Sequence, residues 1–231
     1  MLPIMQYATS DDLSVSLAMQ TASPRTMAEF LAKSAGTWLS HRSVHHFEES
    51  EDESGCSNLV IVPFGPDDSS VGRVCEQFKL ASDGAAGGAR FYWQSNTMSI
   101  DLAEGSAAVL VDIPDPSDVT RGVMYRDIGY LEGLAVASHY VISDDGVMSL
   151  HTEYDRNSGV ERCWFLSDDT RVRVGTSLVM GGVNLVSYST ETRCHEIGSF
   201  HALRRDSEVR RDQLKMSDVN TIKLDGASDN V

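Results

Sequence analysis

Positive charge is scarce in this chain. Its 231 residues include 19 Lys and Arg against 34 Asp and Glu, which gives a net charge of −15 at pH 7. A nucleic-acid-binding protein needs a basic surface to neutralise phosphates, so we expect no nucleic-acid partner. Part of the acidic excess lies in one run at 48–53. We interpret this run as a solvated linker, with a patch that steers a partner as the alternative.

Long apolar runs are missing as well. No run approaches the ~20 residues that a membrane-spanning helix needs. The first 24 residues contain no Lys or Arg, so neither a secretory leader nor an Arg-rich transit peptide is recognisable. We therefore expect a soluble, intracellular chain without a membrane span. A transit peptide removed earlier would leave no trace in this sequence.

Cysteine is also sparse, which bears on redox and metal chemistry. Four cysteines show neither C-x-x-C spacing nor the density of a disulfide scaffold, so we expect a reducing compartment and no structural zinc. The pair His45-His46 does not change this expectation. Neighbouring residues of a strand face opposite sides, so the two cannot chelate one ion together. We predict no metal site.

The length predicts one folded domain with tails. We predict a flexible arm at 1–22, the domain at 23–193 and a basic helical tail with a disordered end at 194–231. The tail spaces apolar residues among arginines, as an amphipathic helix does. It either packs on the domain or docks to an acidic partner.

The domain is predicted to be almost entirely β after one helix at 24–34, which has Ser23 as N-cap and Pro24 at its first position. Apolar or alternating runs then follow one another, separated by Gly, Pro, Asn and Asp. The predicted strands are 38–47, 59–64, 70–80, 89–94, 98–101, 107–113, 122–130, 134–142, 147–154, 161–166, 170–180 and 183–192.

Their connections are too short for crossover helices, so neighbouring strands must pair antiparallel. About ten such strands can close into an up-and-down barrel and so remove the sheet edges. A barrel of this size leaves an interior that holds one small ligand. The fold class is therefore all-β, a lipocalin-like or fatty-acid-binding-protein-like barrel.

The densest stretch of the sequence begins at Gly36, which ends the helix, and continues to Phe47. If it is a strand, Trp38, Ser40 and Arg42 share one face. That combination suits the wall of a cavity that holds a flat, anionic, conjugated ligand better than a dry core.

This stretch, G-x-W-x-S-x-R-x-x-H-H, resembles the opening of the S-type phycobiliprotein lyases, which attach open-chain tetrapyrroles (bilins) to cysteines of antenna proteins. Further matches follow in order over about residues 27 to 193. They comprise 75–78, 88–93, 139–146, 152–154, 161–165, 171–173 and 189–193.

The resemblance implies a chromophore lyase that binds a phycobilin, with phycoerythrobilin as our expectation, and transfers it to a cysteine of an apo-phycobiliprotein subunit, expected to be β. The bilin is the substrate, and no cofactor is implied. The nucleophile belongs to the partner, so the four cysteines here are expected to be dispensable. The resemblance also implies a plastid location in an alga or a cytoplasmic one in a cyanobacterium, and a homodimer is possible.

Guanidinium, aromatic and carboxylate groups are what a bilin needs, for its propionates, rings and pyrrole N–H groups respectively. Arg171 and Arg173 share a strand face, which suits carboxylates or, alternatively, an exterior salt-bridge ladder. The resemblance assigns Arg171 an essential role. It also assigns Trp93, which shares a face with Phe91, to bilin stacking rather than ordinary core packing.

The remaining predicted site residues are carboxylates and residues of the rim. Glu153 and Glu191 are the candidate acids; ionised they accept pyrrole N–H bonds, and protonated they deliver a proton. Glu161 is expected to form a surface pair instead. The resemblance adds Arg42 and His45 as pocket or rim residues, and Arg162 completes the expected ligand-binding set.

A binding module of another class remains as the alternative. A barrel that carries a bilin or a fatty acid and catalyses nothing would show the same strands and the same arginine pair. One departure from the family pattern is that 97–100 reads Thr-Met-Ser-Ile where a second Trp is common. It leaves the ring contacts and the bilin type open.

Overall fold

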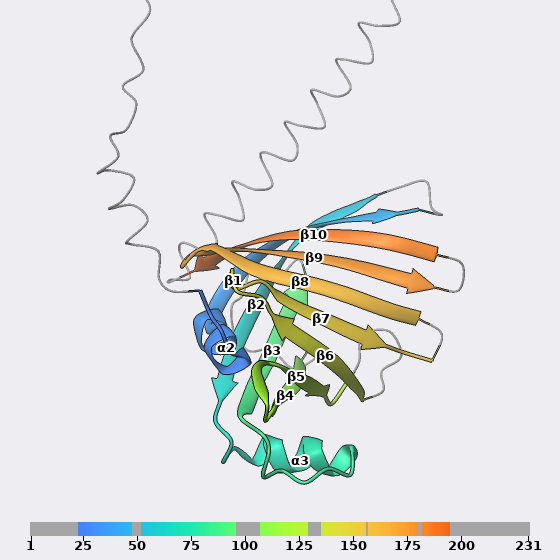
Figure 1. Cartoon of the computed structure of the whole chain (residues 1–231). Helices are drawn as coiled ribbons and strands as arrows, with labels where there is room; N and C mark the ends of the chain where they lie inside the picture. Colours follow the sequence, from blue (N-terminus) through green and yellow to red (C-terminus); the bar gives the residue numbers. More distant parts are fainter. Residues whose placement is uncertain are drawn as a thin grey trace, which may run out of the picture.

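The computed structural model describes residues 23–47, 52–95, 107–128, 135–155, 157–179 and 182–194. Within them the chain forms two helices and ten strands (Figure 1). In chain order these are α2 (Met27–Ser34), β1 (Gly36–His46), β2 (Glu53–Phe64), α3 (Ser69–Gln77), β3 (Gly87–Ser95), β4 (Ala107–Asp115), β5 (Asp118–Arg126), β6 (Val136–Ile142), β7 (Met148–Glu153), β8 (Asn157–Ser167), β9 (Thr170–Val179) and β10 (Gly182–Cys194). The predicted arm 1–22, the strand 98–101 and the tail 195–231 lie outside the described residues.

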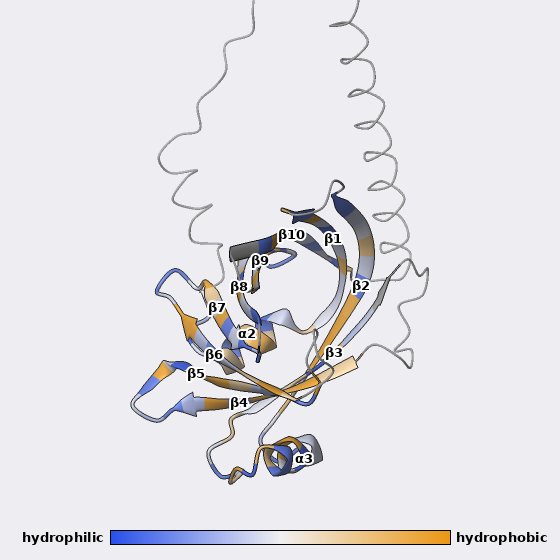
Figure 2. Ribbon diagram, turned by 90° about the vertical axis from the view of Figure 1, so that its right-hand side faces the viewer, coloured by the Kyte–Doolittle hydropathy of each residue, from blue (hydrophilic) through white to orange (hydrophobic). Residues whose placement is uncertain are grey.

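The strands close into one antiparallel barrel in the order β1-β10-β9-β8-β7-β6-β5-β4-β3-β2. Each strand pairs with its neighbours in sequence, and the first strand, β1, pairs with both β2 and the last strand, β10. Figure 2 shows the resulting ring of strands. The predicted ten-stranded up-and-down barrel is confirmed. Closure satisfies the backbone groups that an open edge would expose.

Helix α2 lies at one end of this ring (Figures 1 and 2). It begins one turn later than predicted, because Thr26 is the N-cap and forms a capping box with Glu29, so that Ser23 and Pro24 precede the helix. Its buried face carries Met27, Phe30 and Leu31, which pack into the core cluster inside the barrel. This is the closed end of the barrel.

Helix α3 corrects the predicted strand at 70–80. Asp68 caps it, and Val71, Val74 and Cys75 recur at helical spacing and are buried. They form a second apolar cluster with outward-facing residues of β4, such as Val111. The run 70–80 is too short for its apolar content alone to distinguish a helix from a strand. The spacing of its buried residues by three and four positions is that of a helix.

Strand register fixes which side chains point into the barrel. Trp38 of β1 belongs to the core cluster inside the ring and pairs with Leu59, which belongs to it too. Because side chains alternate along a strand, Ser40, Arg42 and His46 share this inner face with Trp38. The predicted face of Trp38, Ser40 and Arg42 is therefore real, and it is the inner one.

Candidate functional site

A charged cluster sits inside the barrel, centred on Glu191 of β10. The Glu191 side chain is fully buried and lies in register between Ser40 of β1 and Arg171 of β9. The Nε of Arg171 donates to Glu191 Oε2. Arg173 brings its Nη2 to 3.0 Å from Oε1, and the Ser40 hydroxyl donates to the same oxygen over 3.3 Å. Three inner-face residues thus share the Glu191 carboxylate.

The cluster keeps Glu191 ionised. Burial by itself raises the pKa of this carboxyl, but the guanidiniums of Arg173 and Arg171 and the two hydrogen bonds outweigh it, so the pKa is lowered overall. The sequence left open whether Glu191 is ionised or protonated, and this direction favours the carboxylate. Glu191 therefore holds the two arginines in place and is not a proton donor near neutral pH.

Arg171 faces the closed end. It is 3% exposed, and its guanidinium lies over the Trp38 ring at 4.7 Å from the centroid. Arg193 lies over the same indole at 4.1 Å and donates to the carbonyls of Lys33 and Ala35, at the carboxyl end of α2. These contacts tie the helix to the barrel wall, because they satisfy carbonyls that a helix end leaves without partners.

The Arg173 side chain also lies inside the barrel, but it extends away from the closed end. Its side chain is 26% exposed although it points into the barrel, and its Nη1 lies 3.6 Å from Oε2 of Glu161, which is 35% exposed. An inward side chain can be exposed only if solvent reaches the barrel interior. Arg173 therefore lies within reach of solvent and of a ligand inside the barrel, whereas Arg171 is buried.

Inner-face glycines show the same opening. A methyl group placed on Gly55 of β2 would meet no atom within 4 Å, and one on Gly159 of β8 would meet only the Thr176 carbonyl, at 3.7 Å. By register, Gly55 lies beside Arg42 and Gly159 beside Thr152, both on inner positions. The half of the barrel away from α2, which we call the open half, thus has space at its wall beside these two glycines.

Two guanidiniums occur in one row of this lining. Arg42 pairs with Ser189, and Ser189 pairs with Arg173, so Ser189 separates the two arginines. Their backbones are two strand spacings apart, about 10 Å. Arg42 is exposed and Arg173 is partly so. The row therefore presents two cations to whatever enters the open half.

The inner aromatic residues of β3 pack against the core cluster of the closed end. Phe91 and Trp93 lie on the inner face opposite Ile61 and Leu59, and both are half-buried. Arg126 of β5, which is 8% exposed, places its guanidinium 5.8 Å from the centroid of the Trp93 ring. Trp93 and Phe91 thus form an aromatic wall in the barrel, with a cation on the indole.

Three predicted site residues do not lie on the inner face of the barrel. Glu153 alternates with Leu150 and Thr152, which face inward, so it lies outside and is exposed. Arg162 is likewise exposed and alternates with inward Cys163 and Glu161.

His45 is the third. It points outward, with its Nδ1 2.6 Å from Asp52 Oδ1, while its neighbour His46 takes the inner position, with its Nε2 3.4 Å from Glu53 Oε1.

Three inner residues were not among the predicted site residues: Glu161, Arg126 and Arg193. Glu161 was read as a surface partner of Arg162, but in strand β8 these neighbours necessarily face opposite sides. The common face of Cys163 and Phe165 in the same strand was the signal that could have found it. Arg126 and Arg193 carried no such signal, because each lies at the last or the last-but-one position of a strand whose inner face only the register defines.

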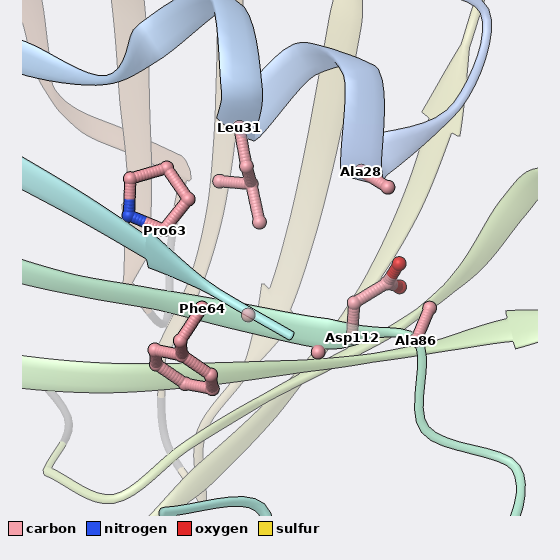
Figure 3. Close-up of a pocket in the computed structure, with 8 residues that line it drawn as sticks. Ala28, Leu31, Pro63, Phe64, Ala86 and Asp112 are labelled. Carbon is pink, nitrogen blue, oxygen red and sulfur yellow. The ribbon is translucent and has the colours of Figure 1, made fainter. Parts of the chain in front are cut away.

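A small separate cavity lies beneath α2 (Figure 3). It measures about 60 Å³ and is lined by Ala28, Leu31, Pro63, Phe64, Ala86, Gly87, Gly88 and Asp112. Burial raises the pKa of Asp112 to about 6, against a smaller lowering by the Tyr140 hydroxyl. The cavity has room for little more than water, so it is not a tetrapyrrole site.

The cysteines are poor nucleophiles. All four are buried, and burial raises the thiol pKa of Cys75 and Cys194, and that of Cys163 to about 12. The described residues contain no group of three or more His, Cys, Asp or Glu that could hold a metal ion. Nor does any helix in the described part have the length and apolarity to cross a bilayer.

The sequence model of the CpeS-like protein family matches residues 26–194, which spans every described strand and α2. The chain belongs to this family, the S-type phycobiliprotein lyases. The resemblance of the motifs is therefore confirmed, and with it the lipocalin-like barrel.

Individual CpeS-like proteins agree. The chromophore lyase CpcS/CpeS 4 of Trichodesmium erythraeum (strain IMS101) is 47% identical over 176 residues, 76% of this chain and 91% of that protein. The chromophore lyase CpcS/CpeS of Synechococcus sp. (strain WH8020) is 42% identical over 171 residues, 74% and 86% of the two chains. Among solved structures, the S-type phycobiliprotein lyase CPES from Guillardia theta superposes with a TM-score of 0.60 at 28% identity, over 74% of this chain and 94% of that one.

Membership of the CpeS-like family fixes the class of activity. The chain is a phycobiliprotein chromophore lyase, and bilins and phycobiliproteins are its partners. The family does not by itself say which side chains hold the bilin.

Proposed function

We propose that this lyase holds a phycobilin, phycoerythrobilin in the first instance, non-covalently in the open half of the barrel and delivers it to a cysteine of a phycobiliprotein subunit. The observation that carries the proposal is the row Arg42–Ser189–Arg173, two cations on an inner wall that is open to solvent. A bilin has two propionates, and a guanidinium binds a carboxylate through paired N–H donors.

The other lining groups complement the rest of the bilin. Trp93 and Phe91 provide the aromatic wall for its rings. Glu161, partly exposed beside Arg173, is placed to accept from the pyrrole N–H groups. Glu191 and Arg171 act behind them, because they orient Arg173 without being exposed themselves.

The reaction needs only the thiol and the bilin. The thiol S–H adds across the ethylidene double bond of the A-ring: sulfur bonds to the exocyclic carbon, the π bond is lost and the proton passes to the ring carbon. Nothing leaves, and a thioether is formed. The lyase contributes by curling the bilin, shielding it from water and presenting one carbon to one cysteine.

The finer assignments belong to the same proposal. We keep β as the acceptor subunit, a homodimer as a possible assembly, and a plastid or a cyanobacterial cytoplasm as the location according to source. We no longer assign a role in the pocket to Glu153, Arg162 or His45, because their side chains lie on the outside of the wall.

Transfer is tested by mixing the protein with phycoerythrobilin and an apo-subunit, then measuring covalent fluorescence of the subunit on a denaturing gel stained with zinc. We expect faster transfer, and a single modified cysteine, compared with free bilin. Equal rates and equal site selectivity with and without the protein would leave only a carrier.

The propionate contacts have their own test. The bilin dimethyl ester lacks both charges, so it should bind wild type about 10- to 100-fold more weakly than the free acid, since charge-assisted hydrogen bonds are worth about 1.5–3 kcal/mol. In Arg42→Met/Arg173→Met the acid and the ester should bind equally. If the double variant still prefers the acid, the propionates bind elsewhere.

A further inference from the structure

Trp93 is the inner aromatic residue that we expect to stack on a bilin ring, and its indole contacts a buried cation. Arg126 is an arginine at 8% exposure on the inner face of β5, and its guanidinium lies 5.8 Å from the Trp93 centroid. In its own row Arg126 pairs with Leu110 and Val136.

Burying a guanidinium is costly unless it is compensated by partners. The planar, weakly hydrated guanidinium is the cation best suited to lie against an indole. Trp93 is only half-buried, so part of its side chain stays accessible beside this contact. The indole also packs against the core cluster, and the contact with Arg126 adds a restraint on its rotation about the side-chain bonds.

We propose that Arg126 is a positioning residue, which holds the Trp93 indole at the angle that a bilin ring needs for stacking. The inference rests on the proposed function, because it assumes that the bilin lies in the open half. Arg126 acts through Trp93, whereas Arg42 and Arg173 bind the bilin directly. Its loss should therefore disorder the bound bilin as well as weaken its binding.

The test compares Arg126→Met and Arg126→Lys with Arg121→Met in the full-length protein. Arg121 is on the outer face of the same strand, 55% exposed and paired with Asp118, so it is a matched control. Bilin binding is followed by visible absorbance, and bilin order by the circular dichroism induced in the visible band. We expect Arg126→Met to weaken binding about 3- to 30-fold and to reduce the induced signal. Arg126→Lys, which keeps the cation but loses the plane, should lie between, and Arg121→Met should match wild type.

Combination with Trp93→Leu separates positioning from direct contact. If Arg126 acts through the indole, Arg126→Met has no further effect on binding in the Trp93→Leu background. An undiminished effect there overturns the proposal and places Arg126 on the bilin itself. Unchanged binding and an unchanged induced signal in Arg126→Met, whatever its stability, overturn it as well.

A measurement without bilin keeps the inference independent of the lyase assay. The near-ultraviolet circular dichroism of wild type minus that of Trp93→Leu is the signal of the ordered Trp93 indole. In the Arg126→Met background this difference should shrink, and in the Arg121→Met background it should persist. A full-sized difference without Arg126 refutes the positioning role. If the difference shrinks but wild type fails to bind bilin, the indole contact stands while the proposed function, and the bilin-positioning role with it, falls.

Discussion

Glu191→Gln is the substitution whose cost the structure defines most sharply. It keeps the shape of the side chain and removes the charge that holds Arg171 and Arg173. Arg171 is 3% exposed and would be left as a buried cation without its anionic partner. Breaking a buried pair from one side costs about 3–5 kcal/mol of unfolding free energy, a large share of the 5–15 kcal/mol typical of a domain.

The effects of substituting Glu191 and Arg171 on the unfolding free energy should be strongly coupled. Arg171→Met alone should cost a similar amount, because Glu191 would then rely on Arg173 and Ser40. The double variant Glu191→Gln/Arg171→Met leaves neither charge of the pair, so its cost should fall about 2–3 kcal/mol below the sum of the single costs. Arg173 tolerates the change better, since it is partly exposed and lies near Glu161.

Urea unfolding at pH 7, with equal m-values required for all variants, measures these free energies. Glu153→Gln, the same substitution at an exposed outer position, serves as the control and should stay within about 0.5 kcal/mol of wild type. A cost below about 1 kcal/mol for Glu191→Gln, with additive effects in the double variant, would refute the interpretation of the cluster as a buried, mutually dependent unit.

Three further predictions concern the core, the opening and the thiols. The raised pKa of Asp112 means that its contribution to stability is complete below pH about 4 and is lost as the pH rises through about 6. The unfolding free energy of Asp112→Asn, measured in urea relative to that of wild type, should therefore rise by about 3 kcal/mol between pH 4 and pH 7.5. A difference that does not change with pH would contradict the raised pKa. Gly159→Val should keep or raise the melting temperature while abolishing bilin binding, because it fills open space on a strand; unimpaired titration would show that the bilin lies elsewhere. Cys163→Ala should lower stability by about 1 kcal/mol and leave transfer to the apo-subunit intact, and loss of transfer in a folded variant would make the thiol a participant.

Strand β1 shows most clearly which features of the site could be predicted from the sequence. Alternation alone put Trp38, Ser40 and Arg42 on one face, and the register confirms it. His45 was predicted from its match to the family motif, whereas alternation puts His46 on the inner face with Arg42. Glu161 was missed although it shares a strand face with Cys163 and Phe165, because its neighbour Arg162 suggested a surface pair.

The pairing of Arg171 with Glu191 was also beyond the sequence. Both residues were predicted as site residues, but their contact depends on the register of β9 with β10. Without that register, Arg171 is expected to bind the ligand as Arg173 does. With it, Arg171 is a buried support for Arg173. Chemical type is readable from a strand, whereas the division of roles between two like residues needs their three-dimensional surroundings.

The position of Glu191 explains how a barrel can be firm and open at once. On one side, Arg171 joins it to Trp38 and thereby to the packed closed end beneath α2. On the other side, Glu191 forms an ion pair with Arg173, whose second contact is the partly exposed Glu161. The stability of the closed end therefore fixes the direction of a guanidinium in the open half before any bilin arrives. A cation held in advance loses less side-chain entropy on binding than a free one. The glycines of the open half can then leave room for the proposed bilin, because the order of its cation is supplied from the other end of the barrel.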